Sequence, residues 1–407
     1  MRGTGRREEP TVRRPACAAA LATTALLLTA ACAGGPADDG TAGRTAPRPS
    51  AQEQRTPPSE AASPTEPRPT RPVEPPPAEG SVEVLSTVAT GLESPWGLAP
   101  LPGGDLLVSS RDAGTILRVS GEDGSVTEVG EVTGVEPGGE GGLLGIALGG
   151  GAAGGHLYAY YTTNSDNRVV RMAYDADDPE SGLGQPDILV RGIPKGPRHN
   201  GGRMAFGPDG MLYVGTGDAD RRGAAQDLDS LAGKILRVEP DGSAPAEGNA
   251  EPGSRVFSLG HRNVQGLAFD GQGRLWASEF GQNEWDEVNL IEPGGNYGWP
   301  EAEGAAGEEG FVDPVAQWRP AEASPSGLAW AEGSLWMAGL GGERLWRVPL
   351  DGEETVAEPE AFLEGEYGRL RTVVADRGGE LWLVTNETDG RGSPEGDDDR
   401  VLKLEVR

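Results

Sequence analysis

The sequence predicts an all-β protein, a six-bladed β-propeller with four-stranded antiparallel blades. Three observations predict it: a six-fold repeat within residues 81–407, alternation of apolar and polar residues in its strands, and Gly/Asp turns between them. The 65 glycines and 34 prolines fit a turn-rich β protein. A two-sheet sandwich would also contain many strands, but it would not explain a repeat of this length.

Each repeat unit has an apolar strand, a turn such as Asp209-Gly210, a second apolar strand and then an alternating third strand. The first and second strands are expected within residues 96–108, 143–159, 202–214, 265–277, 326–337 and 370–383. The third strands are expected at residues 116–119, 169–172, 235–238, 288–291, 345–348 and 401–404. The strand at Val82–Val88 is predicted to pair with the last blade, close the ring and cover its exposed edge.

The residues before the repeat predict export and a membrane anchor. Residues 1–31 have the arginine-rich start and short apolar run of a signal peptide. Leu28–Cys32 resembles a bacterial lipoprotein cleavage box, so Cys32 is predicted to be lipidated; ordinary secretion is the alternative. Residues 32–80 are rich in proline and lack apolar periodicity, which predicts a disordered tether. The domain at 81–407 would then sit on the extracellular face of the bacterial cell membrane, lipid-anchored or secreted.

The charge of the chain limits its partners. The formal net charge is −29, with 64 acidic residues against 35 basic ones. Such a surface repels nucleic acid and anionic lipid headgroups, so contact with the membrane is expected through the lipid anchor only. Basic residues near a pocket become more informative in so acidic a chain.

One candidate for acid–base chemistry is His199 with Asp218. His199 lies in a polar, glycine-flanked loop, and the hairpin that follows would return Asp218 to its neighbourhood. An aspartate beside a histidine holds the imidazole in one tautomer and stabilises its charged form, which suits a general base. The alternative is a loop histidine satisfied by backbone groups.

Other polar runs lie beside the repeat strands. Arg262 could polarise a carbonyl or neutralise an anion, whereas the neighbouring His261 could be structural. The acidic, glycine-containing residues 279–298 offer oxygen ligands for calcium, or form a solvated acidic loop. Arg369 and Arg371 point to the same side of a strand, which suggests an anionic ligand or, alternatively, an ion pair at a blade edge.

Together these blocks resemble the pyrroloquinoline quinone (PQQ)-dependent glucose/sorbosone dehydrogenase family, which includes bacterial aldose sugar dehydrogenases. The resemblance runs from about Val88 to Arg407. Its most specific segments are residues 140–145, 199–203, 216–218, 260–263, 286–289 and 295–300, in this order on the six-unit repeat.

The resemblance implies an oxidoreductase that oxidises the anomeric hydroxyl of an aldose to a lactone, with PQQ and Ca²⁺ as cofactors. A hydride would pass to the quinone, and electrons would go on to an external acceptor. The implied catalytic residues are His199 as general base, Asp218 as its orienting acid and Arg262 at the quinone carbonyl.

The resemblance also implies the residues that hold the cofactors. Besides Arg262, the implied PQQ contacts are Glu140, Asn263, Arg369 and Arg371. Backbone carbonyls of Gly281 and Gln282 would hold a catalytic calcium, and Glu287 with Tyr297 would hold a structural one. A calcium ion and three arginines would supply the positive charge that a tricarboxylate cofactor requires.

Three positions depart from the family pattern. Position 341 is glycine where a lysine often contacts the cofactor, which should weaken cofactor binding. Glu140 replaces the glutamine of some members and puts a carboxylate near a polyanion unless it is protonated or faces a cation. Gln282 stands where a proline is common, which matters less if its carbonyl is the ligand.

Two other functions fit a propeller with these residues. A calcium-dependent hydrolase of the lactonase type would need a central metal held by carboxylates from several blades, and would leave Arg369 and Arg371 unexplained. A cofactor-free cell-surface binding module is supported by the glycine at position 341.

Overall fold

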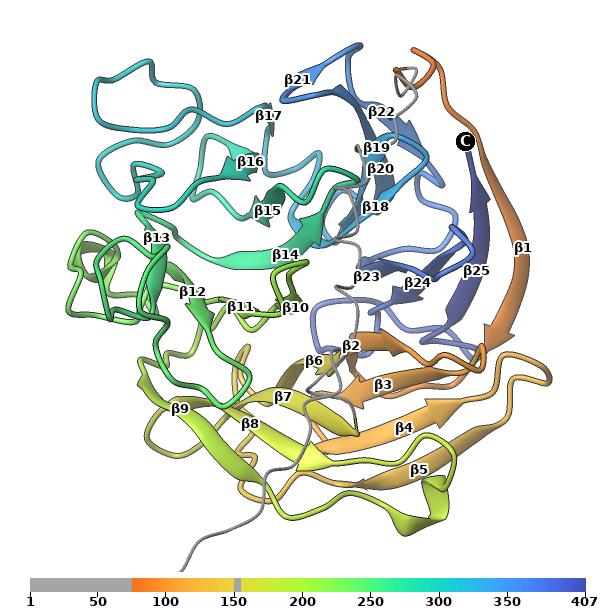
Figure 1. Ribbon diagram of the computed structural model, residues 1–407. Helices are drawn as coiled ribbons and strands as arrows, with labels where there is room; N and C mark the ends of the chain where they lie inside the picture. Colours follow the sequence, from red (N-terminus) through yellow and green to blue (C-terminus); the bar gives the residue numbers. More distant parts are fainter. Residues whose placement is uncertain (1–74, 150–154) are drawn as a thin grey trace, which may run out of the picture. The chain divides into compact units, whose positions relative to one another are not determined.

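The computed structural model describes residues 75–149 and 155–407 and forms a ring of six antiparallel β-sheets (Figure 1). The innermost strands contact one another in a closed cycle. The predicted six-bladed propeller is therefore confirmed. The predicted signal peptide, Cys32 and most of the tether lie outside the described residues. In the described part of the chain, no helix has the length and apolar character needed to cross a membrane.

The first three blades follow one another along the chain. Blade 1 contains β2 (Pro95–Pro100), β3 (Leu106–Ser110), β4 (Thr115–Val119) and β5 (Val126–Glu131). Blade 2 contains β6 (Leu143–Leu148), β7 (His156–Thr162), β8 (Asn167–Ala173) and β9 (Asp187–Ile193). Blade 3 contains β10 (Met204–Phe206), β11 (Leu212–Gly215), β12 (Lys234–Val238) and β13 (Val256–Leu259). Short 3-10 turns occur at Pro179–Ser181 and Arg222–Ala225.

The last three blades vary the same plan. Blade 4 contains β14 (Val264–Phe269), β15 (Leu275–Glu279), β16 (Asp286–Ile291) and β17 (Ala316–Trp318). Blade 5 contains β18 (Pro325–Ala331), β19 (Ser334–Gly339) and β20 (Arg344–Asp351), whose outer edge is shared by β21 (Glu354–Thr355) and β22 (Glu360–Phe362). Blade 6 contains β23 (Leu370–Ala375), β24 (Leu381–Thr385), β25 (Val401–Val406) and the first strand, β1 (Val82–Ala89).

The two ends of the described chain meet in blade 6. β1 pairs antiparallel with β25, and Val82 lies opposite Val406 in the register. The backbone hydrogen bonds continue beyond the strands: the N–H of Ser81 donates to the carbonyl of Arg407, and the N–H of Arg407 donates to the carbonyl of Ser81, both at 3.0 Å. The ring closure predicted for residues 82–88 is therefore confirmed, and it covers the edge that β25 would otherwise expose.

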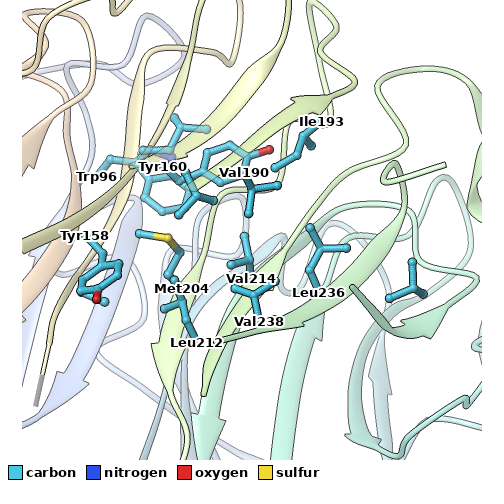
Figure 2. Packing of buried hydrophobic residues seen from close by; sticks show 14 residues of the cluster. Trp96, Tyr158, Tyr160, Val190, Ile193, Met204, Leu212, Val214, Leu236 and Val238 are labelled. Carbon is cyan, nitrogen blue, oxygen red and sulfur yellow. The ribbon is translucent and has the colours of Figure 1, made fainter. Parts of the chain in front are cut away.

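Apolar clusters between neighbouring blades form the core. Figure 2 shows one of them, to which Trp96, Tyr160, Met204 and Leu236 contribute from blades 1, 2 and 3. Its members are almost fully buried, and burial of each large side chain contributes about 1.5–3 kcal/mol. Since each cluster draws on more than one sheet, a blade is stabilised by its neighbours.

Glycines in the innermost strands let the blades approach one another. A Cβ atom at Gly145 would overlap the carbonyl oxygen of Gly202 in the next blade. A Cβ atom at Gly266 would overlap the carbonyl oxygen of Ser326 in the same way. These contacts explain why the repeat places glycine beside apolar residues at the start of its strands.

Candidate active site

A cavity of about 310 Å³ opens where loops from the blades converge. In an antiparallel blade the start of the first strand and the end of the second lie at the same end, so residues flanking these strands meet there. The residues lining the cavity come from all six blades and their connections: Trp96, Arg111, Glu140, Arg198, His199, Arg262, Asn263, Gln265, Phe280, Gly281, Gln282, Asp286, Pro320, Ser324, Leu340, Arg369, Arg371, Asp389 and Arg391.

His199 and Asp218 form a hydrogen-bonded pair at this cavity. His199 precedes β10 and Asp218 follows β11, and Nδ1 of the imidazole lies 2.8 Å from Oδ1 of the carboxylate. The prediction from the hairpin is thus confirmed for this contact. A carboxylate at Nδ1 favours the tautomer with a proton on that nitrogen, which leaves Nε2 as the basic atom. His199 has a positive φ of 56°, and its carbonyl accepts the N–H of Ala219 at 3.1 Å, which locks the loop.

Asp218 itself is fully buried behind His199. Its Oδ1 also accepts the backbone N–H of Asp220 at 2.8 Å, and its Oδ2 accepts the indole N–H of Trp299 at 2.9 Å. Burial alone would raise the pKa of Asp218, but the hydrogen bonds from His199, Trp299 and Asp220 lower it below its usual value. Asp218 therefore remains a carboxylate that can stabilise a charged imidazole.

Arg262 projects into the same cavity from the loop before β14. Its backbone N–H donates to Oε1 of Glu279 at 2.9 Å, and its Nη1 donates to the carbonyl of Phe280 at 3.3 Å. The Nε of Arg262 is buried without a hydrogen-bond partner among the described residues. Burial lowers the pKa of Arg262 even though nearby carboxylates oppose this, but a guanidinium stays charged at neutral pH. An unpaired buried donor of this kind suits an anionic ligand.

The residues beside Arg262 have different roles. Asn263 is buried, lines the cavity and accepts the backbone N–H of Gly201 at 3.0 Å through Oδ1, so it ties blade 4 to the His199 loop. His261 is completely buried and bonds Ser258 at 2.8 Å and Glu279 at 2.6 Å through its two ring nitrogens. These contacts fit the structural role considered for His261.

Arg369 and Arg371 approach the cavity from the start of β23. Both bond Oδ2 of Asp389, Arg369 at 3.3 Å and Arg371 at 3.0 Å. Arg371 also donates to Asn386 at 2.7–2.8 Å and to Gln265 at 3.0 Å. Burial lowers the pKa of Arg371 to about 10, which still leaves it charged at neutral pH. The two arginines thus share one carboxylate, that of Asp389, and line the cavity at the same time.

Glu140 faces a cation. Its Oε1 lies 2.6 Å from Nη2 of Arg391, and its Oε2 accepts the backbone N–H of His199 at 2.8 Å. Of the two ways to accommodate a carboxylate here, protonation or a cationic neighbour, the structure contains the second. The loop at position 341 contributes Leu340 rather than a charge to the lining, while a Cβ atom at Gly341 would meet Oγ of Ser324 at 2.5 Å.

The lining as a whole is cationic. It contains six arginines against three carboxylates, in a chain whose net charge is −29. The arginines are Arg111, Arg198, Arg262, Arg369, Arg371 and Arg391, and the carboxylates are Glu140, Asp286 and Asp389. Arg111 and Arg198 also pair with Asp112 and Asp220, which lie outside the lining. The positive charge left for an anionic ligand therefore comes chiefly from Arg262, Arg369 and Arg371.

The residues predicted to hold the catalytic calcium lie at the cavity. Gly281 and Gln282 follow β15 and line it. Their backbone N–H groups donate to Asp286 at 2.9 Å and to Glu303 at 2.8 Å, and Glu303 accepts four consecutive amides, those of residues 282–285. This carboxylate holds the loop in one conformation. The expectation that two backbone carbonyls bind the metal stays a prediction.

Glu287 and Tyr297, predicted to hold a structural calcium, are not among the residues that line the cavity. Burial, together with the nearby Glu279, raises the pKa of Glu287 above its usual value. The hydroxyl of Tyr297 donates to the carbonyl of Leu290 at 2.6 Å, and its ring stacks on His261. Within residues 75–149 and 155–407, no cluster of three or more His, Cys, Asp or Glu side chains is arranged to hold a metal. The second calcium site also stays a prediction.

Several residues of the site were not predicted from the sequence. Asp389, Arg391 and Gln265 line the cavity, and Trp299 supports Asp218 from behind it. The scarcity of basic residues is the one sequence signal that could have indicated Arg391. Nothing local in the sequence connects Trp299 with Asp218, because 81 positions separate them.

The chain is similar in sequence and fold to known proteins. The family model described as Glucose / Sorbosone dehydrogenase matches residues 92–393. A solved structure of the PQQ-bound form of aldose sugar dehydrogenase from Streptomyces coelicolor is 66% identical, covers 82% of this chain and 100% of its own, and superposes with a TM-score of 0.79.

Two curated relatives also match. Aldose sugar dehydrogenase YliI of Escherichia coli is 29% identical over 77% of this chain and 92% of its own length. Quinoprotein glucose dehydrogenase B of Acinetobacter calcoaceticus is 33% identical over 55% of this chain, and the match spans 54%, about half, of that relative.

Proposed function

This chain belongs to the glucose/sorbosone dehydrogenase family, and on that premise we propose that it oxidises aldose sugars at the anomeric hydroxyl with PQQ and calcium as cofactors. The product would be a lactone, and the electrons would pass to an external acceptor. The PQQ-bound relative and the quinoprotein relative support the cofactor, and both aldose and glucose dehydrogenases among the relatives support a sugar substrate.

The observation that carries the proposal is the excess of arginine over carboxylate in the cavity. PQQ is a tricarboxylate, and six arginines face three carboxylates there. The buried Nε of Arg262 has no partner among the described residues, so a donor is left over for an anionic ligand. Arg262, Arg369 and Arg371, with Asn263 beside them, would hold the cofactor, and Glu140 would stay paired with Arg391.

The residues of the chain would then divide the chemistry. His199 would take the proton of the sugar hydroxyl at Nε2, and Asp218 would stabilise the imidazolium formed, a step that contributes about 10²–10⁴-fold in rate. Arg262 would lie where negative charge develops on oxygen. When bound, the quinone supplies the acceptor for the hydride, and calcium held by Gly281 and Gln282 supplies a Lewis acid. Glu287 and Tyr297 would hold a second calcium.

We also propose that the protein is exported and anchored through lipid on Cys32. The signal-like residues 1–31 and the cleavage box at Leu28–Cys32 support this. Labelling cells with a radioactive fatty acid should label the protein, and Cys32→Ala should abolish the label. Label retained by Cys32→Ala would contradict the anchor.

The test of the proposed activity is a titration of cofactor-free protein with PQQ and Ca²⁺. We expect a change in quinone absorbance at micromolar PQQ, then reduction of an artificial dye when an aldose is added, and loss of dye reduction when calcium is chelated. Absence of an absorbance change would overturn the proposal. Binding without turnover on any aldose would favour the cell-surface binding module, and hydrolysis of a lactone without quinone would favour the hydrolase.

A further inference from the structure

The indole of Trp299 completes the surroundings of Asp218. Its N–H donates to Oδ2 at 2.9 Å, while Oδ1 receives His199 and the backbone N–H of Asp220. Asp218 is fully buried, so each carboxylate oxygen depends on these protein donors and has no access to solvent. The carboxylate therefore cannot rotate without losing a bond on each oxygen.

Trp299 is itself rigidly placed. Its backbone N–H donates to the carbonyl of Gly260 at 2.9 Å, and its carbonyl accepts the side-chain amide of Gln226 at 2.7 Å. Trp299 is 5% exposed and is not among the residues that line the cavity. The guanidinium of Arg262 lies 5.4 Å from the ring centroid and that of Arg222 lies 5.2 Å from it. Two cations beside one ring polarise its N–H towards Asp218.

We propose that Trp299 is a positioning residue for the reaction: it holds Asp218 so that Oδ1 faces Nδ1 of His199, and its ring seats Arg262 beside the same pair. This inference rests on the proposed function, because it assigns Trp299 to the machinery of that reaction. One indole thus connects the base with the arginine, although Trp299 is not among the residues that line the cavity.

Trp299→Phe would remove the indole N–H that Asp218 accepts. Oδ2 of Asp218 would become a buried acceptor without a donor, and the negative charge of the carboxylate would be less offset. The imidazolium of His199 would then hold its proton more tightly. His199 would therefore remain protonated, and unable to act as a base, up to a higher pH. The other charged groups around His199 are Asp220, with an oxygen 3.7 Å from Nδ1, and Arg198, Glu140 and Arg262 at the cavity. Trp299→Phe removes none of these four groups and keeps an aromatic ring beside Arg262.

The experiment compares Trp299→Phe with Trp276→Phe. Trp276 is the matched control, because its buried indole N–H also donates to an aspartate, Asp270, at 3.0 Å, in blade 4 away from the cavity lining. For Trp299→Phe we expect kcat to fall about 10–100-fold, the acid limb of the kcat–pH profile to move to higher pH, and PQQ affinity to stay within about threefold. Trp276→Phe should leave kcat and the profile unchanged. An unshifted profile for Trp299→Phe would overturn the proposal.

A double-mutant cycle separates positioning from a general structural effect. In the Asp218→Asn background, Trp299→Phe should lower kcat less than about twofold further, because the group on which the indole acts has already been changed. A loss as large as in the parent background would show that Trp299 does not act through Asp218, and would overturn the inference.

A measurement on the unsubstituted, cofactor-free protein keeps the inference testable if Trp299→Phe does not fold. With ¹⁵N-labelled tryptophan, the indole N–H resonance of Trp299 should shift with pH at the same midpoint as the His199 ring. This response should vanish in His199→Gln, and the Trp276 resonance should not follow it. A Trp299 resonance indifferent to the titration of His199 would refute the inference. Failure to bind PQQ would instead refute the proposed function and leave this result intact.

Discussion

Glu140 and Arg391, 251 positions apart, form an ion pair of 2.6 Å at the rim of the cavity. The same carboxylate accepts the backbone N–H of His199, so it neutralises one arginine of the site while it holds the loop of the base. Glu140, whose negative charge would oppose an anionic ligand, is therefore neutralised by Arg391. As a result, Arg391 is not free to bind that ligand.

Glu140→Gln should tighten cofactor binding. The amide oxygen can still accept the N–H of His199, but one negative charge disappears and Arg391 becomes free to face the ligand. We expect the Kd for PQQ to fall about fivefold, equivalent to about 1 kcal/mol, in a fluorescence titration. Glu136→Gln, in the same loop but exposed, should leave the Kd unchanged. Weaker binding by Glu140→Gln would show that the carboxylate supports the ligand instead of opposing it.

His199→Gln should abolish the proton transfer but not the binding of cofactor. Without an imidazole at the cavity, kcat for aldose oxidation should fall about 10²–10⁴-fold, while the Kd for PQQ stays within about threefold. Dye reduction and absorbance titration measure the two quantities. His156→Gln, at the start of β7, is the control and should retain activity. Turnover near the parent rate in His199→Gln would remove His199 from the role of base.

Arg371→Lys should weaken cofactor binding although it preserves the charge. The guanidinium of Arg371 donates hydrogen bonds to Asn386, Gln265 and Asp389 at once. The ammonium of a lysine cannot reproduce this planar geometry. We expect a Kd for PQQ about 10–100-fold higher, measured by the same titration. Arg347→Lys is the matched control: Arg347 is equally buried and pairs with Glu360, but lies outside the cavity lining. An unchanged affinity in Arg371→Lys would mean that this arginine contributes charge alone.

Asp218 should also make stability depend on pH in acid. Its pKa in the folded protein is lowered from 3.8, so its contribution to the free energy of unfolding is present above pH 3.8 and is lost as the pH falls through the lower folded value. Asp218→Asn should therefore destabilise the protein by about 1–3 kcal/mol at pH 7 and by less at pH 3. Urea unfolding at both pH values measures this. An equal difference at both pH values would show that the charge of Asp218 does not stabilise the fold.

Local sequence patterns were sufficient for the architecture. The alternation in residues 235–238 and 345–348 predicted strands now seen as β12 and β20, and the six-fold repetition predicted the number of blades. The His199–Asp218 contact was also predictable, because one hairpin joins the two positions and its geometry returns the chain. These features follow from interactions between residues near one another in the sequence.

The contacts of the site between residues far apart in the sequence depended on closure of the ring. Glu140 meets Arg391 across 251 positions, and Trp299 meets Asp218 across 81, from loops of different blades. The sequence by itself determined the strands, the repeat and the family-specific blocks, because periodicity and turn chemistry are local. Only the tertiary structure decided which charges pair at the cavity, because six sheets must close around one axis before those loops share an end of the molecule.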